Sequence, residues 1–121
     1  MKPMTTQFVD IHMHIHYCIY SKREKSFFEW DEAKNRTNLR KHSVRFEIAC
    51  WIFPDPYRLE SFDTVSSFLD EDRWKATGSV HGKILFVVYT EVSNDTVRII
   101  SARCASNREK EAYHVHRKMY N

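Results

Sequence analysis

Apolar and polar positions in the second half of the chain group into three consecutive strand-like stretches. They cover residues 74–80, 84–91 and 96–102, and each contains β-branched or aromatic residues. The short pairs His81–Gly82 and Asn94–Asp95 separate these stretches and suit tight hairpin turns. The pattern therefore predicts an antiparallel meander of three strands.

The part of the chain before this meander predicts a strand, two helices and a further strand. Residues 27–30 form a short apolar strand, and Asp31 can cap a helix that covers residues 32 to about 41. A second helix covers residues 46–53 and must end at the proline that follows, because proline lacks a backbone N–H. Residues 57–62 can form the next strand.

A capping box opens the last predicted helix. Ser106 stands three residues before Glu109, so each side chain can bond the backbone N–H of the other. The order of elements predicts an α+β fold, in which an antiparallel twisted sheet packs two N-terminal helices on one face and a C-terminal helix follows. The other face of the sheet stays partly open, and we expect the functional residues there.

The N-terminal residues differ from the rest of the chain. Residues 8–17 alternate like a strand, and residues 21–26 are charged and linker-like. We interpret residues 1–26 as an N-terminal extension and residues 27–121 as the folded domain. Poor order, an ordered strand and a wrongly assigned start are the alternatives for the extension.

Three histidines in the extension suggest a metal site. His12, His14 and His16 would share one face of a strand, a geometry that can hold zinc or nickel. The pattern Asp-x-His-x-His resembles a strand of amidohydrolase-type metal enzymes, but those enzymes need a barrel of about 250 residues. The chain has 121 residues. We therefore predict no functional metal site and no cofactor, with adventitious metal binding or a small metal-binding protein as alternatives.

Length and composition limit the function classes. A chain of 121 residues supports one ordinary core, and its 2 glycines and 3 prolines argue against disorder. No apolar run reaches the roughly 18 residues of a membrane span, and polar residues follow Lys2 where a secretory signal would be apolar. The three cysteines lack disulfide or metal spacing. We expect a cytoplasmic protein with free thiols and no membrane partner.

Positive charge gathers in the C-terminal part of the chain. The net charge is +3, and six Lys or Arg stand against two Glu from Arg98 onward. This asymmetry favours a surface that binds a polyanion such as RNA. A solvated helix face is the alternative.

The last predicted hairpin carries candidate catalytic residues. If Asn94–Asp95 is a two-residue turn, Glu91 faces Arg98 across the ladder, and Arg103 ends the final strand. A carboxylate with two arginines suits metal-free RNA cleavage, because one group takes the 2′-hydroxyl proton while the guanidinium groups stabilise the pentavalent phosphate. A weak surface salt bridge between Glu91 and Arg98 is the alternative.

Six short blocks between Phe28 and about Tyr113 match a known family in order and combination. The blocks are Phe28–Lys34, Asn38–His42 with Val44 and Phe46, Arg73–Trp74, Val87–Glu91, Arg98–Arg103 and Arg108–Glu109. Together they resemble the BrnT family of bacterial toxins. The resemblance implies a RelE-like fold and a metal-independent endoribonuclease toxin of a type II toxin–antitoxin system, which inhibits translation by cutting RNA.

The resemblance also implies partners and a site. It implies a cognate BrnA-type ribbon-helix-helix antitoxin, which masks the toxin and represses their shared promoter, so that promoter DNA is bound only through the complex. By position it assigns catalysis to Glu91, Arg98 and Arg103. The candidate RNA contacts are Lys41, His42, Arg45, Tyr89 and Arg108. A core position is an equal alternative for Tyr89, and a solvated helix face is one for Lys41 and His42.

The chain departs from the family pattern at two positions. Cys104 stands where the family often has a second basic residue, which would weaken phosphate binding and keeps open a non-catalytic relict that binds only antitoxin or nucleic acid. Ser43 stands where the family commonly has a glycine, at a point where a helix can end in a left-handed turn.

Overall fold

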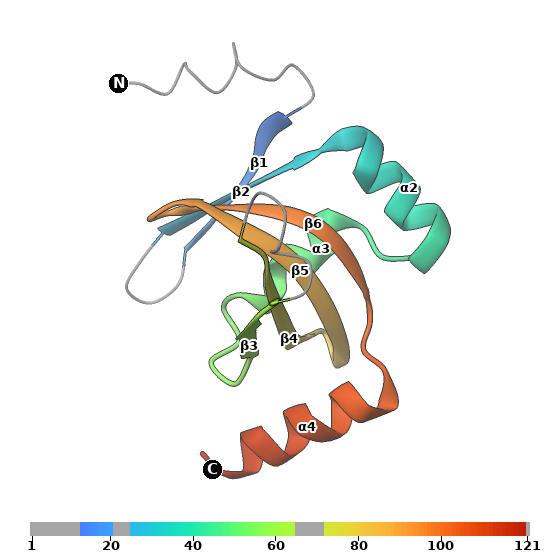
Figure 1. Cartoon of the computed structure of the whole chain (residues 1–121), viewed down its shortest axis with the longest axis vertical. Coiled ribbons are helices and arrows are strands. Elements are labelled where there is room, and N and C mark those ends of the chain that lie inside the picture. Colours follow the sequence, from blue (N-terminus) through green and yellow to red (C-terminus); the bar gives the residue numbers. More distant parts are fainter. Residues whose placement is uncertain (1–12, 21–24, 65–71, 121) are drawn as a thin grey trace.

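A six-stranded sheet with three α-helices forms the protein (Figure 1), and the computed structural model describes residues 13–20, 25–64 and 72–120. The α+β class is confirmed. In chain order the elements are β1 (Met13–Tyr20), β2 (Lys25–Asp31), α2 (Glu32–His42), α3 (Phe46–Ala49), the 3₁₀ turn η1 (Cys50–Ile52), β3 (Leu59–Phe62), β4 (Trp74–Val80), β5 (Lys83–Ser93), β6 (Thr96–Cys104) and α4 (Asn107–Lys118).

The sheet has the strand order β1-β2-β6-β5-β4-β3. The antiparallel meander of β4, β5 and β6 is confirmed. The expectation of a wholly antiparallel sheet is wrong, because β2 pairs with β6 in parallel. The chain leaves β2 through two helices and three strands before β6 returns beside it in the same direction. In register, Glu29 of β2 lies opposite Arg98 of β6.

Residues from the predicted N-terminal extension form an edge strand. The backbone of β1 pairs antiparallel with β2, and Figure 1 shows both strands at the same side of the sheet. Of the candidate metal ligands, His12 lies outside the described residues, and the side chains of His14 and His16 are outside the described part of the chain as well.

The two hairpin turns of the meander form where the sequence predicts them. His81 and Gly82 both have positive φ, 50° and 82°. A tight two-residue hairpin turn of type I′ requires positive φ at both residues, because its twist then matches that of the two strands. Asn94 and Asp95 join β5 to β6. The register beyond that turn differs from the expected one, because it shifts between Glu91 and Ser93.

A β-bulge in β6 changes which side chains share a face. Val88 pairs with Ser101 and Tyr89 pairs with Ile99, so Ile100 is an extra residue on β6. Side chains alternate across a strand, and each extra residue reverses the alternation beyond it. Arg98 and Arg103, five positions apart, therefore lie on the same face of the sheet.

The core lies between the helices and the face of the sheet opposite Arg98 and Arg103. Helix α2 contacts β2 and β6, α3 contacts β6, and η1 contacts β4. The close approach of η1 depends on Gly78, because a Cβ at that position would lie 2.8 Å from Cβ of Ile52. Buried Trp30, Phe46 and Val87 belong to this core.

Local capping explains the ends of both long helices. The Asp31 side chain accepts a hydrogen bond from the Ala33 backbone N–H at 2.9 Å, which opens α2 as predicted. Ser43 ends α2 in the left-handed region with φ 61°, the turn that glycine usually makes. The predicted capping box of Ser106 and Glu109 is confirmed at the start of α4. No helix in the described ranges is long and apolar enough to cross a membrane.

Candidate functional site

The face of the sheet opposite the core carries two arginines. We call it the arginine face, and it consists of Glu29, Lys75, Thr77, Phe86, Val88, Thr90, Arg98, Ser101 and Arg103. The strand registers define it: Arg98 pairs with Thr90, and Arg103 pairs with Phe86, four residues earlier on the same strand. Helix α4 borders this face, because Glu109 bonds Arg103 and α4 contacts β4.

Glu29 holds one of these arginines. Its carboxylate is buried, with a side-chain exposure of 3%, and Oε2 accepts a hydrogen bond from Nε of Arg98 at 2.9 Å. The Arg98 side chain is 31% exposed, and no described residue bonds its terminal nitrogens. The carboxylate therefore fixes the guanidinium group from its Nε side and leaves the terminal N–H groups to face a ligand.

The second arginine, Arg103, forms more hydrogen bonds than Arg98. Nη1 and Nη2 of Arg103 each donate to one carboxylate oxygen of Glu109 at 2.9 Å, and Nη1 also donates to the Cys104 carbonyl at 3.2 Å. The guanidinium carbon lies 4.2 Å from the ring centre of Phe86. These bonds leave the Nε–H and one Nη2–H, which share an edge of the planar group and can bind two phosphate oxygens.

Glu109 remains ionised in this arrangement. The hydrogen bonds from Arg103 lower the pKa of the Glu109 carboxyl most, and bonds from Ser106 lower it further, against an opposing effect of partial burial. An ionised Glu109 is suited to orienting Arg103 and is not suited to donating a proton. The site thus contains two arginines, each oriented by its own carboxylate.

The expected pairing of Glu91 with Arg98 is wrong. Glu91 lies opposite Val97, which packs against the core, whereas Arg98 lies opposite Thr90. Paired residues share a face, so Glu91 projects on the core side of the sheet and Arg98 on the other side. The predicted trio of Glu91, Arg98 and Arg103 is therefore not assembled, and the carboxylate beside Arg98 is Glu29.

Tyr89 is a core residue, so its predicted stacking on a base is wrong for this structure. The residue is 3% exposed, and its ring packs edge-to-face on Phe53 with 5.0 Å between the ring centres. Its hydroxyl donates to Oε2 of Glu60 at 2.7 Å. Burial and this hydrogen bond raise the pKa of the Tyr89 hydroxyl. Of the two alternatives for Tyr89, the core position is the observed one.

The other candidate RNA contacts lie in two places. Lys41 and His42 are exposed in the last turn of α2, and Arg45 is exposed just before α3. Both helices cover the core side of the sheet, so these side chains lie away from the arginine face. Arg108 is exposed in the first turn of α4, next to Glu109, and it alone among the four borders the arginine face.

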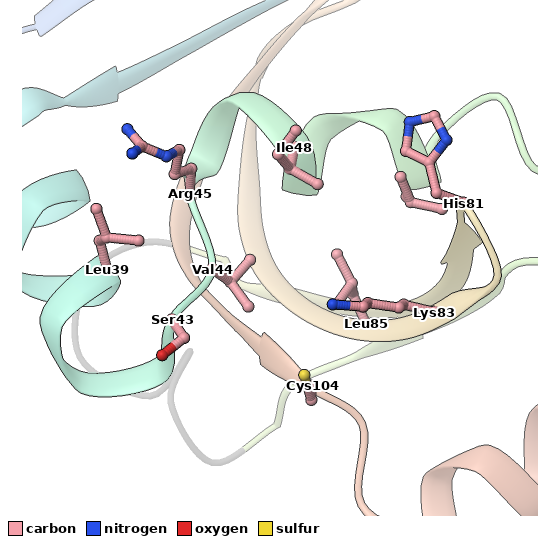
Figure 2. A pocket seen from close by; sticks show the side chains of 10 residues that line it. Leu39, Ser43, Val44, Arg45, Ile48, His81, Lys83, Leu85 and Cys104 are labelled. Carbon is pink, nitrogen blue, oxygen red and sulfur yellow. The ribbon is translucent and has the colours of Figure 1, made fainter.

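Cys104 points away from the arginine face. It follows Arg103 on β6 and lines a pocket on the core side of the sheet (Figure 2). Successive side chains of a strand point to opposite faces, so a basic residue at position 104 would also point into this pocket. The cysteine therefore removes no cation from the arginine face, contrary to the expectation that it weakens phosphate binding there.

Sequence reasoning missed both orienting carboxylates. Glu29 falls inside a recognised block, but nothing local indicates that it is buried against a residue of β6. Glu109 is visible as a capping residue, and its second role in bonding Arg103 depends on how α4 leaves the sheet. In the described part of the chain, no three His, Cys, Asp or Glu side chains gather in a way that could hold a metal ion.

Comparisons with known proteins identify a family whose model matches the chain. A family model described as the ribonuclease toxin BrnT of type II toxin–antitoxin systems matches residues 30–109, which is more than half of the chain. The chain is also similar to the BrnT ribonuclease toxin of Brucella abortus, known from a crystal structure at 1.1 Å resolution. The identity is 29%, the match covers 64% of this chain and 94% of that one, and the TM-score is 0.49. A comparison with curated proteins finds no match.

Proposed function

The chain belongs to the BrnT family of ribonuclease toxins of type II toxin–antitoxin systems, and we propose that it cleaves RNA on the arginine face without a metal ion. We further propose a RelE-like ribonuclease that acts in the cytoplasm and is neutralised by a BrnA-type antitoxin. The antitoxin masks the arginine face, and promoter DNA is bound only through the complex.

One observation carries the proposed site. The bulge at Ile100 brings Arg98 and Arg103 to one face, and each keeps N–H groups that no described residue accepts. Fixed cationic donors that meet a phosphate stabilise the charge that develops in the transition state, because they need no reorganisation during the reaction. Orienting carboxylates provide that fixation, since Glu29 holds Arg98 and Glu109 holds Arg103.

The reaction follows from this placement. The 2′-oxygen of a ribose attacks the adjacent phosphorus and loses its proton to a base, while the bond from phosphorus to the 5′-oxygen breaks and that oxygen takes up a proton. The products are a 2′,3′-cyclic phosphate and a 5′-hydroxyl. Arg98 and Arg103 stabilise the pentavalent phosphate, and Glu29 and Glu109 are positioning residues that act through them.

The remaining candidate RNA contacts extend the site. Arg108, beside Glu109 at the start of α4, is proposed to bind a phosphate next to the one held by Arg103. Lys41 and His42 contact RNA only where the strand passes around the sheet, because they lie on the core side. Phosphate contacts of this kind add affinity without sequence preference.

The test compares two substitutions in the site with one outside it. Arg98→Ala and Arg103→Ala are each expected to lower the rate of RNA cleavage by about 100-fold, the usual effect of removing one transition-state donor. Lys118→Ala, at an exposed position in the last turn of α4, serves as the matched control and is expected to cleave like the wild type. Purified proteins, a fluorescent RNA and thermal unfolding as a check of the fold are sufficient.

Other outcomes would overturn parts of the proposal. Wild-type rates for both arginine variants would remove the arginine face as the site. Loss of cleavage in EDTA would replace the metal-free reaction with a metal-dependent one. A wild-type chain that binds the antitoxin tightly, leaves RNA intact and does not arrest growth would indicate a relict toxin.

A further inference from the structure

A pocket on the core side of the sheet is lined by residues that take no part in the proposed RNA cleavage. It has a volume of about 280 Å³ and lies between the end of α2, the start of α3 and the β4–β5 turn (Figure 2). We propose that this pocket receives one large apolar side chain of the antitoxin, flanked by Asp or Glu residues. This inference rests on the proposed antitoxin partner and assigns where that partner is anchored.

The walls of the pocket are aliphatic. They consist of Leu39, Val44, Ile48, Val80 and Leu85. Ile48 is 42% exposed, so one wall of the pocket presents an apolar side chain to solvent. The volume lies just below the range of about 300–1,000 Å³ that accommodates whole small-molecule ligands. It is large enough to admit an anchoring side chain, the element that dominates the binding energy of many protein interfaces.

The rim of the pocket carries positive charge. Arg45 and Lys83 supply it, His81 also lines the rim, and the lining contains no Asp or Glu. All three residues are exposed, and no described carboxylate forms a salt bridge with them. In Figure 2 the Lys83 side chain points toward Val44 and overlaps Leu85 in this view. Charge complementarity therefore favours an occupant with carboxylates beside its apolar anchor.

A segment of protein fits this pocket better than a segment of RNA. Bases bind to proteins mainly by stacking on aromatic side chains, and no Phe, Tyr or Trp lines the pocket. The pocket also opens on the core side of the sheet, whereas Arg98 and Arg103 lie on the other side. One strand of RNA would have to pass around the sheet to fill both sites.

The position of the pocket explains how its occupant would inhibit the toxin. Cys104 lines the pocket, and its neighbour Arg103 belongs to the arginine face. A segment anchored at Cys104 needs only to pass the end of β6 to reach Arg103 and Glu109. Carboxylates in that segment would then occupy the free edge of the Arg103 guanidinium group and exclude the phosphate of RNA.

Alkylation of Cys104 reports occupancy of the pocket in the native protein. The Cys104 thiol is exposed, whereas Cys50 is buried and burial raises its pKa to about 12, so native Cys50 is an internal control that does not react. The full chain is treated with iodoacetamide alone or in the presence of a purified BrnA-type antitoxin. Mass spectrometry then measures labelling at each cysteine over time.

The expected result is labelling of Cys104 that slows about tenfold or more in the complex, with Cys50 unlabelled in both samples. Unchanged labelling of Cys104 in a saturated complex would overturn the pocket as the anchor site while leaving the antitoxin partner in place. Protection of Cys104 by a 2′-O-methyl RNA would overturn it in favour of RNA. Failure of the wild-type chain to bind the protein would overturn both the partner and this site.

A charge reversal tests the cationic rim. Lys83→Glu is expected to raise the Kd for the antitoxin by about tenfold or more, because an anionic flank would then meet a carboxylate. Lys118→Glu is the matched control, since it makes the same change of charge on α4 away from the pocket. Both variants should keep the wild-type unfolding temperature. An equal loss of affinity in the two variants would reveal a general charge effect and contradict the proposed anchor.

Discussion

Arg98 donates its Nε–H to the buried carboxylate of Glu29 at 2.9 Å across a parallel pair of strands, although 69 positions separate the two residues in the chain. The pair links β2 to β6, the last strand in chain order. It also orients the partly exposed Arg98 side chain on the arginine face. A single interaction therefore contributes to the fold and prepares the proposed site.

Substitution of Glu29 should reveal this double role. Glu29→Gln keeps the shape of the side chain but removes its charge, and it is expected to lower the free energy of unfolding by about 1–3 kcal/mol, as for other hydrogen bonds to buried charged groups. Chemical denaturation measures this loss. Glu111→Gln, at an exposed position on α4, is the control and should change stability by less than about 0.5 kcal/mol.

A double-mutant cycle then assigns the effect to the pair. If Glu29 acts through Arg98, the change Glu29→Gln should cost much less in an Arg98→Gln background than in the wild type. The same pattern is expected for RNA cleavage, because Glu29 is proposed to act on the phosphate through Arg98. Additive losses in both measurements would show that the two residues act separately.

Tyr89→Phe distinguishes a core tyrosine from an RNA contact. The change removes a hydroxyl that donates to Glu60 at 2.7 Å and leaves the packed ring in place. We expect a loss of stability of about 0.5–1.5 kcal/mol, the usual contribution of one hydrogen bond. RNA affinity, measured with a non-cleavable RNA, should be unchanged. A weaker affinity without a loss of stability would contradict the core assignment.

The bond between Glu109 and Arg103 predicts a dependence of stability on pH. The pKa of Glu109 is lowered in the folded protein from its ordinary value of 4.5, chiefly by Arg103. The folded state therefore favours the ionised carboxylate, so this contribution is fully present above pH 4.5 and is lost as the pH falls through the lowered pKa. Because Glu109 is partly exposed, solvent screening limits its size.

Comparison with Glu109→Gln isolates that contribution. The variant cannot ionise, so its stability should differ most from that of the wild type near neutral pH. The two curves should converge as the pH is lowered below 4.5, where the wild-type carboxyl also takes up its proton. Thermal unfolding of both proteins across this range gives the curves. A constant difference at every pH would indicate that Glu109 acts only through its capping bonds.

Local features of the fold could be predicted because each depends on neighbouring residues. The capping box of Ser106 and Glu109, the cap at Asp31 and the turn at His81–Gly82 are all satisfied within a few residues. Strand and helix positions followed from the same short-range patterns. Pairings between distant segments could not be predicted, because no local pattern encodes that β2 lies parallel to β6.

The sequence by itself determined the family, the order of the elements and the presence of arginines in the last strand. Only the tertiary structure decided which face those arginines occupy. One extra residue at Ile100 reverses the alternation of β6, so Arg98 and Arg103 lie on the same face of the sheet. The register shift after Glu91 places that residue on the core side. Side chains along a strand alternate between its two faces, so one inserted residue moves every later side chain to the opposite face. Such an insertion is defined only by the pairing of two strands.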